Sequence, residues 1–428
     1  MRALGRVRSP AGRRSAVAMA DQGLSAATNF ALSVLVARAV TADEFGAFGI
    51  AFAVYMLTRG ISNALWAAPV TIRHADGEPG HRLDQVALSA GAAALTGVAV
   101  GVPLLAVGLV IGGPIGAGLV PLAVCMPGLL LQDAWRQGFV THAQPGKAAL
   151  NDLVWAVLQL AGVAAIVASV EDPTIAPMML VWGLAGSGAG LFASVQSRRL
   201  PSARGLRQMM RDHRHLGPQF AGEFAVTNGQ GQVTLVALAA ISGTTATAGF
   251  RGAQVLFGPQ RVLANGLILA VLPEGVRMKR APHRLHWLVR SLSGLNTLLV
   301  VMMGAVLLLL PQSAGEAILG DSWAATRPVI LPMLAFGITG TLASGPSIGL
   351  RVIERAGTCL RNQLMVSPVS VAAAIVGMVV GGAAGAAWGM AAAGAFGTYL
   401  WISSWRREAL AFETSMTSPP GTSAPAVR

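Results

Sequence analysis

Residues 45–72 read FGAFGIAFAVYMLTRGISNALWAAPVTI, an apolar run that is long enough to cross a bilayer. At about 100° per residue, Tyr55, Arg59 and Asn63 fall within one face of the helix that this run predicts. An arginine at the centre of a bilayer costs at least about 2.5 kcal/mol, so this face must meet water, a counter-charge or an anionic ligand. The stretch therefore predicts a membrane-spanning helix with one polar wall.

Polar residues of this region return at the same spacing in the second half of the chain. A shift of 202 positions pairs residues of like chemistry without any gap: Asp21/Glu223, Thr28/Gln230, Arg59/Arg261 and Asn63/Asn265. Phe48 and Phe250 match under the same shift. Because intramembrane arginine and asparagine are rare, the match indicates two halves of common design, which is how many secondary transporters are built.

The composition is that of a polytopic membrane protein. Of 428 residues, 54% are hydrophobic and 11% are charged, whereas soluble domains carry about 25% charged residues. The net charge of +13 comes from lysines and arginines in short loops between apolar runs, which is typical of the positive-inside bias of membrane proteins and not of nucleic-acid binding. The two cysteines, Cys125 and Cys359, indicate neither a disulfide framework nor a metal site.

Runs of about 20 apolar residues predict about twelve spans. They cover residues 16–40, 46–72, 86–111, 115–139, 148–170, 175–196, 217–242, 248–274, 287–310, 328–350, 360–381 and 384–405. Lysine and arginine concentrate in alternate connections, so we expect both termini in the cytoplasm and the protein in the cytoplasmic membrane. The expected fold is an all-α membrane protein with two pseudo-symmetric six-helix lobes around a central cavity.

The same pattern predicts how the chain is divided. The expected parts are a basic cytoplasmic leader (1–15), an N-lobe (16–197), a basic interlobe linker (198–216), a C-lobe (217–405) and a disordered cytoplasmic tail (406–428). The linker is rich in arginine and falls where the first half ends and the second begins.

A polar stripe with helical spacing runs along the predicted eighth span. It consists of Arg251, Gln254, Gly258, Arg261 and Asn265. Because the second span carries a matching polar face, we expect both walls to line a solvated cavity between the lobes. The candidate binding residues are therefore Tyr55, Arg59, Asn63, Gln230, Arg251, Gln254, Arg261 and Asn265. The alternative is that Arg59 pairs with Asp21, and Arg261 with Glu223, as buried ties between adjacent helices.

Several carboxylates lie in or near the predicted spans. Asp21 and Glu223 are the candidates for proton or sodium coupling, because a carboxylate in a low-dielectric cavity can exchange a proton during a transport cycle. Each also lies near the cytoplasmic end of its span, where it can reach the interface instead. Asp133 and Arg136, three residues apart, are expected to form a local ion pair. The polar residues of the fifth span either extend the cavity or mark the interface: Asn151, Asp152 and Gln159.

The sequence argues against a membrane-embedded enzyme. Its histidines lie in the predicted loops, and no paired-carboxylate, Ser/His/Asp or metal-ligand spacing occurs. The longest outer connection, roughly residues 311–327, holds only Glu316 and Asp321 as acids. We therefore expect neither enzymatic activity nor a metal ion or cofactor.

The first two helices resemble those of a known family. The residues that carry the resemblance are Asp21-Gln22-Gly23-Leu24-Ser25, Asn29-Phe30, Val36-Ala37-Arg38 and Asp43-Glu44-Phe45-Gly46. They are similar to the opening of the polysaccharide and lipid-linked oligosaccharide exporters of the multidrug/oligosaccharidyl-lipid/polysaccharide (MOP) flippase superfamily. The two-lobe layout is similar over nearly the whole chain. The resemblance implies a transporter that moves a polyprenyl-pyrophosphate-linked glycan across the membrane by alternating access.

In flippases of this type a cationic cavity is thought to hold the pyrophosphate and sugar headgroup. The resemblance places Arg59, Arg251 and Arg261 on the headgroup, and it assigns hydrogen bonds with the sugar to Tyr55, Asn63, Gln230, Gln254 and Asn265. It also implies the bilayer and proteins of polysaccharide biosynthesis as partners. Two other functions stay open. A cation-coupled multidrug antiporter of the same superfamily would have cationic substrates, which these arginines would repel; a membrane scaffold or enzyme of polysaccharide biosynthesis would not need matched polar walls.

Overall fold

The computed structural model describes residues 10–70, 79–142, 144–214, 216–227, 229–279 and 281–417, and all regular structure within these ranges is helical. The first six crossings form the N-lobe. Its elements are α2 (Pro10–Ala39), α3 (Ala42–Ser62) with its π-helical continuation η1 (Asn63–Ala67), α5 (Pro79–Ile111), α6 (Gly113–Thr141), α7 (Pro145–Ser169) and α8 (Ile175–Ser197). Helices α5, α6 and α7 each have a proline in the first turn or the interior, where neighbouring helices tolerate it.

The C-lobe follows a short helix, α9 (Leu206–His213), in the basic linker. Its elements are α10 (Leu216–Thr227), α11 (Gly229–Leu256), α12 (Gly258–Met278), α13 (Pro282–Leu308), α14 (Gln312–Leu319), α15 (Ser322–Val352) and α16 (Ala356–Thr417). Within the described ranges, nine helices are long and apolar enough to cross a membrane, and the apolar part of α2 is a shorter tenth.

Two of the C-lobe helices are each a pair of helices joined at glycine. Helix α11 breaks at Gly243, which has φ 85° and ψ 179°, and α16 breaks at Gly381 and Gly382, the latter with φ 55°. These angles favour glycine because a Cβ would clash with the backbone. The two limbs of α16 then run back along each other, and an ideal Cβ on Gly377 would lie 2.0 Å from the carbonyl oxygen of Gly385. The first limb of α11 continues α10, and α12 continues its second limb; with α13, α15 and the two limbs of α16 the C-lobe also has six crossings, so the expected fold class is confirmed.

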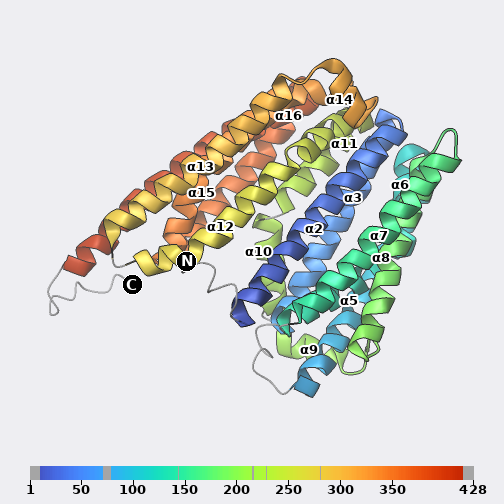
Figure 1. The fold of residues 1–428 in the computed structure, drawn as a ribbon, viewed down its shortest axis with the longest axis horizontal. Coiled ribbons are helices and arrows are strands. Elements are labelled where there is room, and N and C mark those ends of the chain that lie inside the picture. The colour runs from blue at the N-terminus through green and yellow to red at the C-terminus, as the bar shows by residue number, and fades with distance from the viewer. Residues whose placement is uncertain are drawn as a thin grey trace.

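The two lobes lie side by side, with α2 and α3 of one beside α11 and α12 of the other (Figure 1). Helix α3 approaches the C-lobe closely at two levels. An ideal Cβ on Gly46 would lie 2.0 Å from the carbonyl oxygen of Thr244, and one on Gly60 would overlap the ring of Phe224. Small residues thus let helices from opposite lobes approach to backbone contact.

The 202-residue repeat is visible in the packing. Phe48 and its counterpart Phe250 are both buried, and so are Ala51 and Ala253. At the start of α3, Asp43 accepts hydrogen bonds from Thr244, at 2.9 Å, and from its own counterpart, Thr245. A residue that contacts its own counterpart must lie on the pseudo-two-fold axis that relates the lobes.

We predict that Gly377→Ala lowers the melting temperature of the detergent-purified protein. The added methyl group enters the contact between the limbs of α16, and overpacking of this kind costs about 1–3 kcal/mol. The matched control is Gly294→Ala on α13, where an ideal Cβ meets nothing within 4 Å. Alanine is the better helix former, so this control should leave the melting temperature unchanged or raise it. Equal shifts in the two variants would contradict the prediction.

Candidate functional site

A polar cavity of about 370 Å³ lies inside the N-lobe. Helices α2, α3, α6, α7 and α8 form its walls. Its polar lining consists of Ser25, Thr28, Asn29, Tyr55, Arg59, Gln132, Arg136, Gln137, Asp152 and Gln159, and its aromatic lining of Phe52, Trp155 and Trp182. We call it the N-lobe cavity.

Asp152 of α7 is the centre of a hydrogen-bond network in this cavity. Its Oδ2 accepts from the Nε of Arg136 at 2.7 Å and from the hydroxyl of Ser25 at 2.8 Å, and its Oδ1 accepts from Gln132 at 3.0 Å. Asn151 extends the network, since it accepts from Gln132 at 3.0 Å and donates to the backbone of α8. A carboxylate with this many donors is a tie between helices α2, α6 and α7.

Arg59 faces a different carboxylate in the same lobe. Its Nε lies 3.7 Å from the Oδ1 of Asp133, whose side chain is only 5% exposed. That oxygen and the hydroxyl of Tyr55 are buried, and neither has a hydrogen-bond partner among the described residues. The pair therefore has opposite charges close together without a direct hydrogen bond, so its attraction is mainly electrostatic.

These contacts correct one expectation. Asp133 and Arg136 were expected to pair locally, but they point to different partners, Arg59 on α3 and Asp152 on α7. The buried position of both side chains explains the difference, because charges deep in a lobe must reach whatever opposite charge lies across from them.

A second cavity, of about 650 Å³, lies between the lobes. Helices α2 and α3 form one wall, and α11 and α12 form the other. Every member of the predicted stripe lines it: Arg251, Gln254, Gly258, Arg261 and Asn265. The remaining lining is largely apolar, and Leu263 is 59% exposed. We call it the interlobe cavity.

The arginines of the interlobe cavity have no acidic partner in the part of the chain that the structure describes. No described carboxylate lies within 4.0 Å of Arg251 or Arg261. The guanidinium of Arg251 instead stacks 4.4 Å from the centre of the Phe52 ring, with its buried Nε unbonded, and it repels the guanidinium of Arg261. Stacking on an aromatic face is worth only about 1–2 kcal/mol, so the positive charge stays available to an anion.

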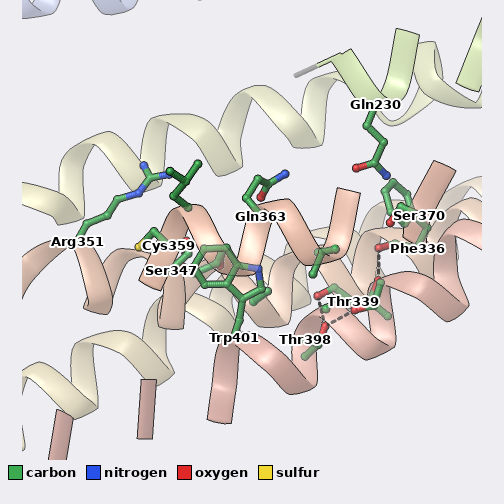
Figure 2. Close-up of a pocket in the computed structure, with 17 residues that line it drawn as sticks. Gln230, Phe336, Thr339, Ser347, Arg351, Cys359, Gln363, Ser370, Thr398 and Trp401 are labelled. Carbon is green, nitrogen blue, oxygen red and sulfur yellow. Dashed lines mark hydrogen bonds between the residues drawn. The ribbon is translucent and has the colours of Figure 1, made fainter. Parts of the chain in front are cut away.

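The candidate binding residues fall into four groups. Arg251, Gln254, Arg261 and Asn265 line the interlobe cavity, and Tyr55 and Arg59 line the N-lobe cavity. Gln230 faces a third cavity, inside the C-lobe (Figure 2). Asn63 begins the π-helical turn η1 and lines none of the three. Asp21 and Glu223 have side chains outside the described part, so their predicted pairing with Arg59 and Arg261 is untested.

The matched arginines therefore occupy different surroundings, although their cavities adjoin. Ala26, Asn29, Phe52 and Met56 line both the N-lobe and the interlobe cavity. Sequence reasoning missed the Asp152 network because spacing along one helix does not reveal partners on the next. A usable signal was present: Gln132 and Arg136 are one turn apart on α6, and Asn151 and Asp152 open the neighbouring α7. Among the described residues, no group of three or more His, Cys, Asp or Glu could hold a metal ion.

No family model and no curated protein sequence matches this chain. Solved structures do match. An inward-facing MATE family multidrug resistance transporter of the MOP superfamily is 12% identical, covers 92% of this chain with 96% of its own length, and superposes with a TM-score of 0.68. The lipid II flippase MurJ in an inward closed conformation is 11% identical, with coverages of 94% and 90% and a TM-score of 0.70.

A third match is a MOP superfamily transporter from Pyrococcus furiosus described as having a binding pocket of reverse polarity. It is 14% identical, with coverages of 94% and 95% and a TM-score of 0.58. At these identities the likeness concerns the fold. The chain is a multi-pass membrane protein with the fold of MOP superfamily transporters, and these structural neighbours are transporters and flippases, not enzymes.

We predict that Asp152→Asn destabilises the purified protein by about 3–5 kcal/mol, because it removes the carboxylate charge that lies 2.7 Å from the buried Arg136. The control is Asp84→Asn, which removes an exposed carboxylate 3.0 Å from Arg199 and should cost less than about 1 kcal/mol. Thermal unfolding in detergent measures both. A loss no larger for Asp152→Asn than for Asp84→Asn would show that the network does not hold the N-lobe together.

Proposed function

We propose that this protein transports an anionic, lipid-linked glycan across the cytoplasmic membrane by alternating access. The substrate class is a polyprenyl-pyrophosphate-linked oligosaccharide or a related precursor of a cell-surface polysaccharide. The observation that carries the proposal is the pair Arg251 and Arg261 in the interlobe cavity, with no described carboxylate within 4.0 Å of either. Two cations without a described acidic partner in a low-dielectric cavity favour a ligand with at least two negative charges.

The rest of the interlobe cavity fits the other parts of such a molecule. Its lining combines the amides of Gln254 and Asn265 with apolar side chains such as Phe30 and Leu263. Amides can hydrogen-bond a sugar, and an apolar wall between the lobes suits a lipid tail that stays in the bilayer while the headgroup passes. The cavity therefore has the chemistry of an amphiphile with an anionic head.

The arginines do not contribute equally. Arg59 faces Asp133, so its charge is largely compensated within the N-lobe. We therefore assign the headgroup to Arg251 and Arg261 and give Arg59 a supporting role at the boundary of the two cavities. Asn63 and Gln230 lie outside the interlobe cavity, so we leave them out of the headgroup contact.

A multidrug antiporter is the second candidate, because a MATE family transporter shares the fold. The charge of the interlobe cavity opposes it. A cationic drug would enter a space lined by two like charges, and moving a cation there is unfavourable in a low dielectric. The same vesicle experiment separates the two candidates when a cationic dye replaces the glycan lipid.

We predict that Arg251→Gln and Arg261→Gln each slow transport at least about tenfold in proteoliposomes loaded with a fluorescent polyprenyl-pyrophosphate glycan, because a hydrogen bond to a charged group contributes about 1.5–3 kcal/mol. The matched control is Arg327→Gln, since Arg327 lies near the start of α15, where it donates to Gln312. This control should transport normally. Near-normal rates in both cavity variants, with the protein correctly inserted, would remove the headgroup role.

For energy coupling we propose Asp21 and Glu223, the matched acids of the two lobes. Asp21→Asn or Glu223→Gln is expected to make glycan-lipid transport insensitive to an imposed proton or sodium gradient, because an amide cannot take up and release a proton. The gradient dependence is measured in the same vesicles, with Asp84→Asn as an acid-to-amide control on the surface. Unchanged gradient dependence in both variants would exclude these two residues as coupling groups.

A further inference from the structure

The third cavity, of about 630 Å³, lies inside the C-lobe (Figure 2). This volume falls within the range of small-molecule sites, about 300–1,000 Å³. Each helix around it contributes residues at helical spacing. Helix α15 contributes Phe336, Thr339, Ala343, Ser347 and Arg351. The first limb of α16 contributes Cys359, Gln363, Val366 and Ser370, and the second limb contributes Gly394, Thr398 and Trp401. Helix α11 contributes Gln230. We call it the C-lobe cavity.

The C-lobe cavity is the counterpart of the N-lobe cavity. Gln230 lines it, and its match under the 202-residue shift, Thr28, lines the N-lobe cavity. The fourth, fifth and sixth crossings of each lobe form walls of both cavities, and α3 adds a further wall to the N-lobe cavity. The chemistry, however, differs. Four charged residues line or border the N-lobe cavity, whereas the C-lobe cavity has one, Arg351, at the end of α15.

The hydroxyl groups of the C-lobe cavity use their protons on the helix backbones. Thr339 donates to the carbonyl of Phe336 at 2.8 Å, Ser347 to that of Ser344 at 3.0 Å, and Thr398 to that of Thr339 at 2.7 Å. A hydroxyl oxygen that donates its proton still has lone pairs to accept with. These hydroxyl oxygens therefore offer acceptors, and the amides of Gln230 and Gln363 offer both donors and acceptors, so a matching ligand both donates and accepts hydrogen bonds.

Two further features restrict the ligand. No described carboxylate lines the C-lobe cavity, so a cationic donor would meet Arg351 without a described counter-charge beside it. The side chain of Trp401 is 9% exposed and lies between Arg351 and the Thr339–Thr398 pair (Figure 2). An indole presents a flat apolar surface together with one polar edge. Uncharged hydroxyl groups on a ring with apolar faces satisfy all of these conditions.

We propose that the C-lobe cavity is a second binding site, for the uncharged sugar portion of the transported molecule. This assignment rests on the proposed function, and it gives the anionic head and the glycan separate sites in the protein. Gly394 allows the close approach of α16 to α15 at the wall of this site. An ideal Cβ there would lie 2.2 Å from the hydroxyl oxygen of Thr339, so a larger residue would force the Thr339 side chain or the helix to move at the place where Thr398 donates to the Thr339 carbonyl.

The test measures the binding of two neutral disaccharides, maltose and N,N′-diacetylchitobiose, to the full-length protein in lipid nanodiscs. Thermophoresis gives the dissociation constant of each. We expect saturable binding that Thr398→Val weakens at least about fivefold, because one wall acceptor is lost. The matched control is Thr326→Val, on α15. Thr326 is fully buried and donates to the Ser322 carbonyl at 2.8 Å, whereas Thr398 is half-buried, and Thr326 lines none of the three cavities. It should leave the affinity unchanged.

Ser347→Ala provides a second variant that does not disturb a contact between helices, and it too should weaken binding. The proposal is overturned when the native protein binds neither disaccharide, or when Thr398→Val and Ser347→Ala bind both as the native protein does. Failure of the headgroup assignment looks different. Normal transport in Arg251→Gln and Arg261→Gln, together with disaccharide binding that Ser347→Ala weakens, would refute the anionic substrate and leave the saccharide site standing.

Discussion

A charge inside the hydrocarbon region must find an opposite charge, water or a ligand, and the placement of helices around the arginines follows from this constraint. In the N-lobe the requirement is met internally, since Arg136 pairs with Asp152 and Arg59 faces Asp133. Between the lobes, the described residues place the ring of Phe52 beneath Arg251 and no carboxylate within 4.0 Å of Arg251 or Arg261. Ion pairs within a lobe hold its helices together, and cations without a described counter-charge are the candidates for binding an anion.

One aromatic side chain separates these two situations. The Phe52 ring packs 6.1 Å from that of Trp182 on the N-lobe side and lies under the guanidinium of Arg251 on the other. It lines both cavities. A change in the N-lobe cavity that moves Trp182 or Tyr55 must therefore also displace Phe52, which forms part of the wall of the interlobe cavity under Arg251. Protein cores are packed too tightly to absorb such a shift locally.

Much of the fold could be predicted from the sequence. The length of the apolar runs predicts the membrane helices, and the matched polar residues predict the repeat. The polar stripe from Arg251 to Asn265 was also predictable. Its members run from the end of α11 into α12, and helical spacing alone puts them on one face. The N-lobe network was not. Its donors and acceptors lie on different helices, and only the packing of α6 against α7 decides that Arg136 meets Asp152 and not Asp133. The C-lobe cavity was hidden for a related reason: serine and threonine facing a hollow are indistinguishable, in sequence, from those facing a neighbouring helix.

The hydrogen bonds of Asp43 have a meaning for the history of the chain. Because Asp43 meets its own counterpart, Thr245, this contact lies on the axis between the lobes. In a dimer of two identical lobes the same position would set aspartate against aspartate, two like charges in direct contact. Because both lobes belong to one chain here, the two positions can differ, and an acid opposite a hydroxyl gives a hydrogen bond where two acids would repel each other. The asymmetry of this pair is therefore open to a single chain with two lobes and closed to a homodimer, in which every change appears on both sides of the axis.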